Sequence, residues 1–144
     1  MVLDSTILVS AFLTPYGLAA QLLSHARRGA FALYLSEQIL AETQEVLLER
    51  KHIRQRYPYT DDQAIRFCRS LRLGVYLVSD LPTVTGVVRD PNDDHVIACA
   101  LAAHASYLVT RDPDLLTLDT YKEVKIITPE EFMGILRERA YDKR

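Results

Sequence analysis

Short apolar runs alternate with amphipathic helical patterns from one end of the 144-residue chain to the other. The runs have the length and composition of buried strands and lie at residues 2–3, 31–35, 75–78, 107–109 and 124–127. Helix starts stand between them, with Ser36, Thr60 and Thr128 in capping positions. Because strands joined by helical crossovers run parallel, this order predicts an α/β fold with a mostly parallel sheet covered by helices.

Length and composition narrow the class of protein further. With 144 residues and 49% hydrophobic content, residues 1–144 are expected to form a single domain around one core. The formal net charge of −2 provides no global basic field, so any nucleic-acid contact needs a local basic patch. Cys68 and Cys99 lie in apolar helical patterns without a paired spacing, which favours reduced core thiols and a cytoplasmic location. The sequence carries no signal-peptide pattern and no apolar run of about 18 residues, so we expect neither secretion nor membrane insertion.

An acidic stretch opens the most apolar helix pattern of the chain, at residues 89–103. Pro91 cannot continue a preceding helix, and Asn92 and Asp93 are good N-caps. One helix face then recurs at spacings of three and four residues, through Asp94, Ile97, Ala98, Leu101 and Ala102. Asp94 is therefore expected to share the face that meets the core. Such acids can also serve only as caps that complement the helix dipole, and this stretch alone does not decide between a cap and a site.

Four carboxylates follow strands or lie toward the core: Asp4, Glu42, Asp94 and Asp112. Because the carboxyl ends of parallel strands share one edge of a sheet, and the following helices begin there, we expect the four to converge. Clustered acids raise one another's pKa and form a hard-oxygen site suited to Mg²⁺ or Mn²⁺. Taken alone, Glu42 fits a solvated helix acid better than a ligand. The sequence contains no Cys/His set for zinc, no GxxxxGK(S/T) phosphate loop and no GxSxG elbow.

The densest run of cations lies between two helix patterns, at residues 50–56, and is followed by Tyr57 and Tyr59. Basic side chains interleaved with aromatic rings can hold phosphates and stack bases. The RNA-binding residues expected from this run are Arg50, Lys51, Arg54 and Arg56. A solvated helix end, or a surface for an acidic partner, is the alternative interpretation.

Four sequence blocks together resemble the signature of PIN domains. They are residues 2–11 (VLDSTILVSA), 40–42 (LAE), 90–98 (DPNDDHVIA) and 108–112 (LVTRD). The likeness covers essentially the whole chain and is greatest to small bacterial and archaeal PIN proteins related to VapC, the toxins of toxin–antitoxin systems. It implies an α/β/α sandwich and an endoribonuclease that uses Mg²⁺ or Mn²⁺ to hydrolyse phosphodiester bonds in RNA.

The resemblance also assigns residues. The family's acidic quartet, which binds the ion and carries the hydrolysis, is matched by Asp4, Glu42, Asp94 and Asp112. Thr110 matches a polar position beside that site, whereas Asp93 and Asp114 have no fixed counterpart and are expected to support the quartet or cap a helix. Thr6 stands where the family commonly has Asn, but its hydroxyl can still bind a carboxylate or a water.

Partners follow from the same likeness: RNA as substrate, a cognate antitoxin protein, and a homodimer or higher homo-oligomer, with no membrane. Two alternatives stay open. A catalytically silent PIN fold could bind RNA or a protein if Thr6 weakens the ion site. A phosphatase or phosphotransfer domain could instead use Asp4 as its nucleophile.

Overall fold

The structure, a computed structural model, describes residues 1–142, and the side chains of residues 1–139. Within that part six strands form one sheet in the order β3-β2-β1-β4-β6-β5. They are β1 (Val2–Leu3), β2 (Tyr34–Ser36), β3 (Tyr76–Val78), β4 (Tyr107–Val109), β5 (Thr120–Tyr121) and β6 (Val124–Ile127). All neighbouring pairs are parallel except β5 with β6. The expected mostly parallel sheet is confirmed.

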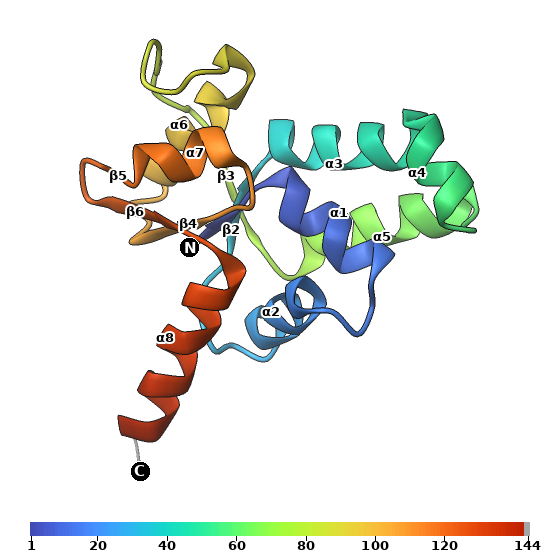
Figure 1. The fold of residues 1–144 in the computed structure, drawn as a ribbon, viewed down its shortest axis with the longest axis horizontal. Coiled ribbons are helices and arrows are strands. Elements are labelled where there is room, and N and C mark those ends of the chain that lie inside the picture. Colours follow the sequence, from blue (N-terminus) through green and yellow to red (C-terminus); the bar gives the residue numbers. More distant parts are fainter. Residues whose placement is uncertain (143–144) are drawn as a thin grey trace.

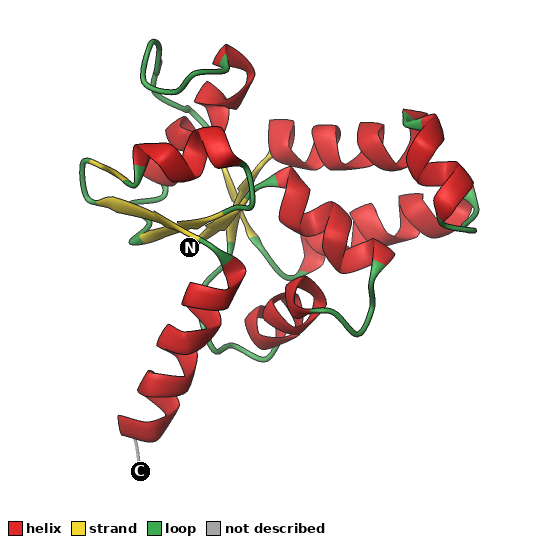
Figure 2. Ribbon diagram, viewed as in Figure 1, coloured by secondary structure: helices red, strands yellow, loops and turns green. Residues whose placement is uncertain are grey.

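Helices connect the parallel strands and lie on both sides of the sheet. They are α1 (Ser5–Leu13), α2 (Leu18–Arg27), α3 (Glu37–Glu49), α4 (Lys51–Arg56), α5 (Asp61–Leu73), the 3₁₀ helix η1 (Pro91–Asp93), α6 (Asp94–Ala102), α7 (Pro113–Leu118) and α8 (Pro129–Asp142). Figure 1 shows α7 above the sheet, α2 and α8 below it, and α3, α4 and α5 projecting to the right. The strands lie between these helices in Figure 2, so the fold is an α/β/α sandwich, as expected.

The helix starts expected from the sequence are present and hydrogen-bonded. Ser36 Oγ accepts from the amide of Ile39 at 3.1 Å and begins α3. Thr60 and Gln63 form a reciprocal capping box at α5, and Gly74 ends that helix. The side chains of Thr128 and Glu131 exchange the same kind of bonds at α8. Local sequence therefore sets where these helices begin.

One core joins the sheet to the helices on both sides. Leu3, Leu35 and Leu108 of the central strands are fully buried with Ile97 of α6. Phe132 of α8 is buried in the same core and meets the Phe31 ring edge to face at 5.0 Å. Fully buried aliphatic side chains contribute about 1.5–3 kcal/mol each relative to exposure, so this core is the main stabilising element.

The two cysteines are buried and free, as expected for core thiols. Burial raises the pKa of the Cys99 thiol to about 11. Among the described residues, no single helix is long and apolar enough to cross a membrane, and the pair α1 and α2 that reaches this length together is bent by 102°.

Three local features differ from the sequence expectation. The second strand begins at Tyr34, three residues later than expected, and of residues 31–33 only Leu33 is buried. The two-residue strand β5 was not expected, since its only partner is the neighbouring β6. The basic segment forms a separate helix, α4, and does not extend α3, because Arg50 leaves the helical conformation with ψ of 105°.

Candidate metal centre

Asp4 lies at the point of the sheet where the chain stops adding strands on one side of β1 and continues on the other. It follows β1 directly, and β1 pairs in parallel with β4, with Leu3 opposite Val109. The next strand after β1 lies on its other side, so β1 and β4 flank the topological switch point. The carboxyl ends of strands at such a point form the usual ligand crevice of an open α/β sheet.

The Asp4 carboxylate is held by three donors while almost fully buried, at 3% exposure. Oδ1 accepts from the Thr6 hydroxyl at 2.5 Å and from the amide of Ile7 at 3.2 Å, which makes Asp4 the N-cap of α1. Oδ2 accepts from the hydroxyl of Thr110. Burial nevertheless outweighs these bonds and raises the pKa of Asp4, with a further contribution from the charge of Asp112.

Thr110 links Asp4 to the next acidic segment. Its Oγ1 donates to Asp4 and accepts from the amide of Asp112 at 2.9 Å. Asp112 then caps α7, where its Oδ1 accepts from the amide of Asp114 at 2.9 Å. The turn after β4 is thereby fixed against the turn after β1.

Three carboxylates meet beside this turn. One oxygen from each of Asp93, Asp112 and Asp114 lies within 4.8 Å of the other two. Asp93 Oδ2 is buried and has no hydrogen-bond partner among the described residues. Burial first, then contact with the Asp112 carboxylate and the charges of Asp90 and Asp4, raise the pKa of Asp93 to about 7. A buried, unpaired carboxylate oxygen beside two further carboxylates is an environment that a hard divalent cation stabilises, so these residues fit Mg²⁺ or Mn²⁺.

Glu42 approaches the same pocket from α3. Its Oε1 lies 2.7 Å from His95 Nε2. The pocket has a volume of about 540 Å³ and is lined by Ser5, Thr6, Glu42, Glu45, Val46, Glu49, Arg50, Asp90, Asn92, Asp93 and Asp112. Of the basic side chains in the described part of the chain, Arg50 is the one that lines it. Glu42 and Asp112 thus line one cavity, and Asp4, which does not line it, is joined to it by the hydrogen bond from the lining residue Thr6.

Of the two neighbouring acids at the start of α6, Asp93 and not Asp94 joins the three-carboxylate cluster. Asp90 Oδ1 accepts from the amide of Asn92 at 3.0 Å and starts η1 at Pro91, so α6 begins only at Asp94. Successive residues of a helix point about 100° apart. Asp94 follows the core-facing stripe, as its spacing predicts, and one of its oxygens is buried without a partner. Asp93, one position earlier, is the acid that reaches the cavity.

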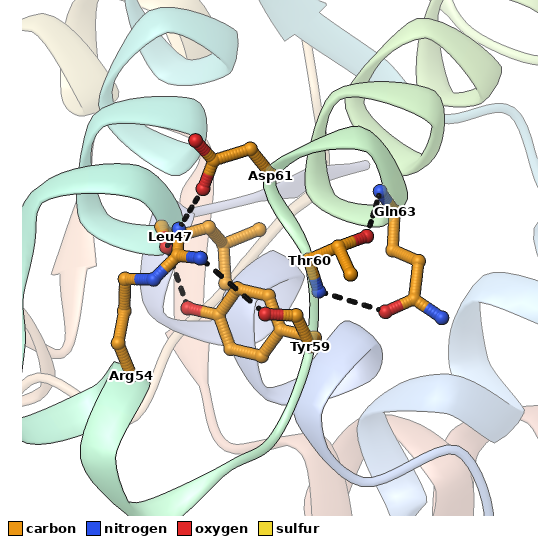
Figure 3. Close-up of polar contacts among 6 residues, drawn as sticks. All are labelled: Leu47, Arg54, Tyr59, Thr60, Asp61 and Gln63. Atoms are coloured by element: carbon orange, nitrogen blue, oxygen red, sulfur yellow. Dashed lines mark hydrogen bonds and ion pairs between the residues drawn. The ribbon is translucent and has the colours of Figure 1, made fainter.

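Arg54 does not have the RNA-binding environment expected for it. Figure 3 shows its guanidinium enclosed between α3 and the start of α5. It pairs with Asp61 at 2.5 Å, donates to the carbonyls of Leu47 at 3.4 Å and Tyr59 at 3.3 Å, and lies 5.0 Å from the centroid of the Tyr59 ring. Both terminal nitrogens of its guanidinium contact oxygens of the protein, so Arg54 fastens the α4–α5 connection.

The other expected RNA-binding residues are exposed. Lys51 and Arg56 lie on α4, with the Arg56 guanidinium 5.7 Å from the Tyr57 ring centroid. Arg50 lines the acidic pocket. His95 was not expected at the site from the sequence. The signal that could have indicated it is a single histidine directly after the acidic cap of an apolar helix.

No curated protein matches the sequence significantly. The sequence profile of the PIN domain matches residues 1–114, from β1 into the first turn of α7. This span contains every acid of the cluster. PIN domains are generally nucleases that act on RNA and usually bind divalent metal ions. Since the match covers well over half of the sequence, the chain belongs to the PIN domain family.

Proposed function

We propose that the protein is a Mg²⁺- or Mn²⁺-dependent endoribonuclease that hydrolyses phosphodiester bonds in RNA. The observation that carries this proposal is the meeting of Asp93, Asp112 and Asp114 within 4.8 Å, around a buried oxygen of Asp93 that lacks a partner. We propose that Asp93, Asp112 and Asp114 hold the ion, that Glu42 of α3 joins them at the same pocket, and that Asp4 supports them as a buried negative charge.

Each residue contributes in a different way. A bound ion supplies a lowered pKa for water and stabilises negative charge on the phosphate. Asp93 and Asp112 offer it carboxylate oxygens, and Asp114 completes their cluster. Thr6 and Thr110 donate to the two oxygens of Asp4 and so hold this buried carboxylate in one orientation. Arg50, the cation in the pocket, is placed to bind a substrate phosphate.

The geometry disfavours the phosphatase alternative. A nucleophilic carboxylate must present an oxygen to the phosphorus atom. Asp4 is 3% exposed and both of its oxygens already accept hydrogen bonds. Such an acid is suited to hold charge in place, and poorly suited to attack. Thr6, which stands where the family commonly has Asn, still donates a hydrogen bond to Asp4, so the substitution does not leave this carboxylate without a partner at that position.

The wider setting is proposed from the likeness to VapC-related proteins. On this basis the protein is the toxin of a toxin–antitoxin system in the cytoplasm, with a cognate antitoxin as partner, and works as a homodimer or higher homo-oligomer. We also propose that residues 1–144 form a single domain, which is supported by the burial of Phe132 of α8 in the core of the sheet.

Cleavage of an RNA panel in Mn²⁺ tests the function, with two neighbouring variants as a matched pair. Asp93→Asn removes one ligand charge at nearly constant volume and is expected to lower the rate at least about 100-fold, as loss of an ion ligand does. Asp94→Asn makes the same chemical change one residue away and is expected to retain most activity. Wild-type protein that cleaves no RNA in Mn²⁺ would refute the enzyme, and a more severe loss in Asp94→Asn would return the ligand role to Asp94.

A further inference from the structure

His95 is a largely buried side chain that contacts Glu42 of the acidic pocket and does not itself belong to the carboxylate cluster. Its side chain is 10% exposed, against 34% for Glu42, and Nε2 lies 2.7 Å from Glu42 Oε1. We propose that His95 is a positioning residue: it holds the Glu42 carboxylate in the orientation that binds the ion. This inference rests on the ion site of the proposed function and adds a residue to it.

The contact joins two parts of the fold that carry different acids. Glu42 lies on α3, which begins after β2, whereas His95 lies in the first turn of α6, two residues after Asp93. The two residues are 53 positions apart in sequence. The bond therefore fixes the acid that comes from α3 relative to the helix start that carries Asp93.

The chemistry of Glu42 and His95 determines which of the two donates the hydrogen bond. A carboxylate has only acceptor oxygens, so the imidazole Nε2 carries the hydrogen and donates it. The other ring nitrogen, Nδ1, is buried without a partner among the described residues, so the ring makes this one polar contact within the protein. One oxygen of Glu42 is thereby occupied and the other is left to a ligand. Without the bond, a partly exposed glutamate samples several rotamers and must lose that freedom when the ion binds.

Residues that orient an ion ligand typically change ion affinity or activity by 10- to 100-fold when removed. We therefore expect His95→Leu, which keeps the bulk and removes the donor, to weaken Mn²⁺ binding by about that factor in calorimetric titration of the full chain. His95→Gln can still donate through Nε2 and is expected to recover affinity to within about threefold. His104→Asn, an exposed position just beyond the other end of α6, is the matched control and should bind Mn²⁺ as wild type does.

A double variant separates positioning from general damage. If His95 acts through Glu42, then His95→Leu weakens Mn²⁺ binding in the wild-type background and has no added effect in Glu42→Gln. Equal loss in both backgrounds, equal impairment of His95→Leu and His95→Gln, or unchanged affinity in His95→Leu would each overturn the proposal. Should His95→Leu fail to fold, the comparison of His95→Gln with Glu42→Gln decides, since only the first should retain affinity.

The measurement is independent of RNA cleavage. If the wild-type protein binds Mn²⁺ with the expected dependence on His95 and yet cleaves no RNA, the enzyme is refuted and the positioning role stands. If the wild-type protein cleaves RNA and His95→Leu retains full ion affinity and kcat, the positioning role is refuted and the proposed enzyme stands. Absence of any Mn²⁺ binding by the wild-type protein would overturn the positioning role, because no ion site would exist to be oriented.

Discussion

The hydroxyl of Thr110 serves two acidic segments at once. It is fully buried, donates to Asp4 Oδ2 and accepts from the amide of Asp112. Thr110→Val keeps the shape of the side chain and removes both bonds, which leaves a buried carboxylate oxygen and an amide unpaired. Each unpaired group costs about 1–3 kcal/mol. Because one hydroxyl makes both bonds, we expect the two losses together to cost about 3 kcal/mol. We expect urea denaturation to show that decrease in the free energy of unfolding, together with weaker Mn²⁺ binding.

Thr110→Ser is the control for this change, since it keeps the hydroxyl and removes only a methyl group. It should retain ion affinity and lose about 1 kcal/mol of stability at most. A valine variant as stable as the serine variant would mean that the two bonds to Thr110 do not hold the turn after β4.

Which of the neighbouring acids Asp93 and Asp94 reaches the cavity could not be predicted from the sequence. The helix period placed Asp94 with the apolar stripe, and Asp94 does follow that stripe. Which acid reaches the cavity depends instead on where α6 begins, and the side chain of Asp90 decides that by starting a 3₁₀ turn first. Periodicity determines a face of a helix but not its first residue, so the sequence located the acidic helix start but not which of the two acids joins the carboxylate cluster.

At the scale of elements, Arg54 fastens α4 to the start of α5. Its contacts with Asp61, Leu47 and Tyr59 are made by a side chain that is 27% exposed (Figure 3). Arg54→Gln removes the ion pair and at least one charge-assisted bond, so we expect the free energy of unfolding to fall by about 1–2 kcal/mol. Chemical denaturation measures this directly.

Arg56→Gln provides the comparison, because Arg56 is exposed on the same short helix. Its effect on stability should stay within about 0.5 kcal/mol. If Arg56 contacts RNA phosphate, the variant also binds every RNA more weakly and loses about one unit of salt slope. A larger loss of stability in Arg56→Gln than in Arg54→Gln would contradict the assignment of these two side chains.

Helix starts that depend on a few neighbouring residues were predicted correctly from the sequence. Ser36, Thr60 and Thr128 begin helices where their side chains can accept amide hydrogens, and this depends on four consecutive residues only. The contacts of Arg54 could not be predicted from local sequence, because its partners are set by the way α4 folds back on α5. A cation next to aromatic rings looks the same in sequence whether it is solvated or enclosed.

At the scale of the whole molecule, the alternation of strands and helices was enough to predict the sheet and the edge at which the acids meet. Asp4 and Asp112 follow parallel neighbours, β1 and β4, and therefore must lie near each other. The pairing of Glu42 with His95 could not be predicted in this way, because it joins two helices that are brought together only when the sheet is complete.

The acid cluster makes the stability of the whole protein depend on pH and on ions. The pKa of Asp93 is raised from 3.8 to about 7, so between these values the folded state binds more protons than the unfolded state. The free energy of unfolding of the ion-free protein therefore falls as the pH rises through that window, and the loss is complete above about pH 7. A bound divalent ion replaces the proton and removes this penalty.

We therefore expect Mn²⁺ to raise the melting temperature more at pH 8, where Asp93 is ionised, than at pH 5, where the ion must displace a proton. A ligand at 100 times its Kd stabilises the folded state by about 2.7 kcal/mol, which corresponds to roughly 5–11 °C for a chain of this length. Thermal melts with and without Mn²⁺ at both pH values measure the difference. Asp93→Asn should melt higher than the wild type at pH 8 without ions, because the repulsion is gone, and should gain little from Mn²⁺. A wild-type shift that is equal at both pH values, or an unchanged response in Asp93→Asn, would place the ion away from Asp93.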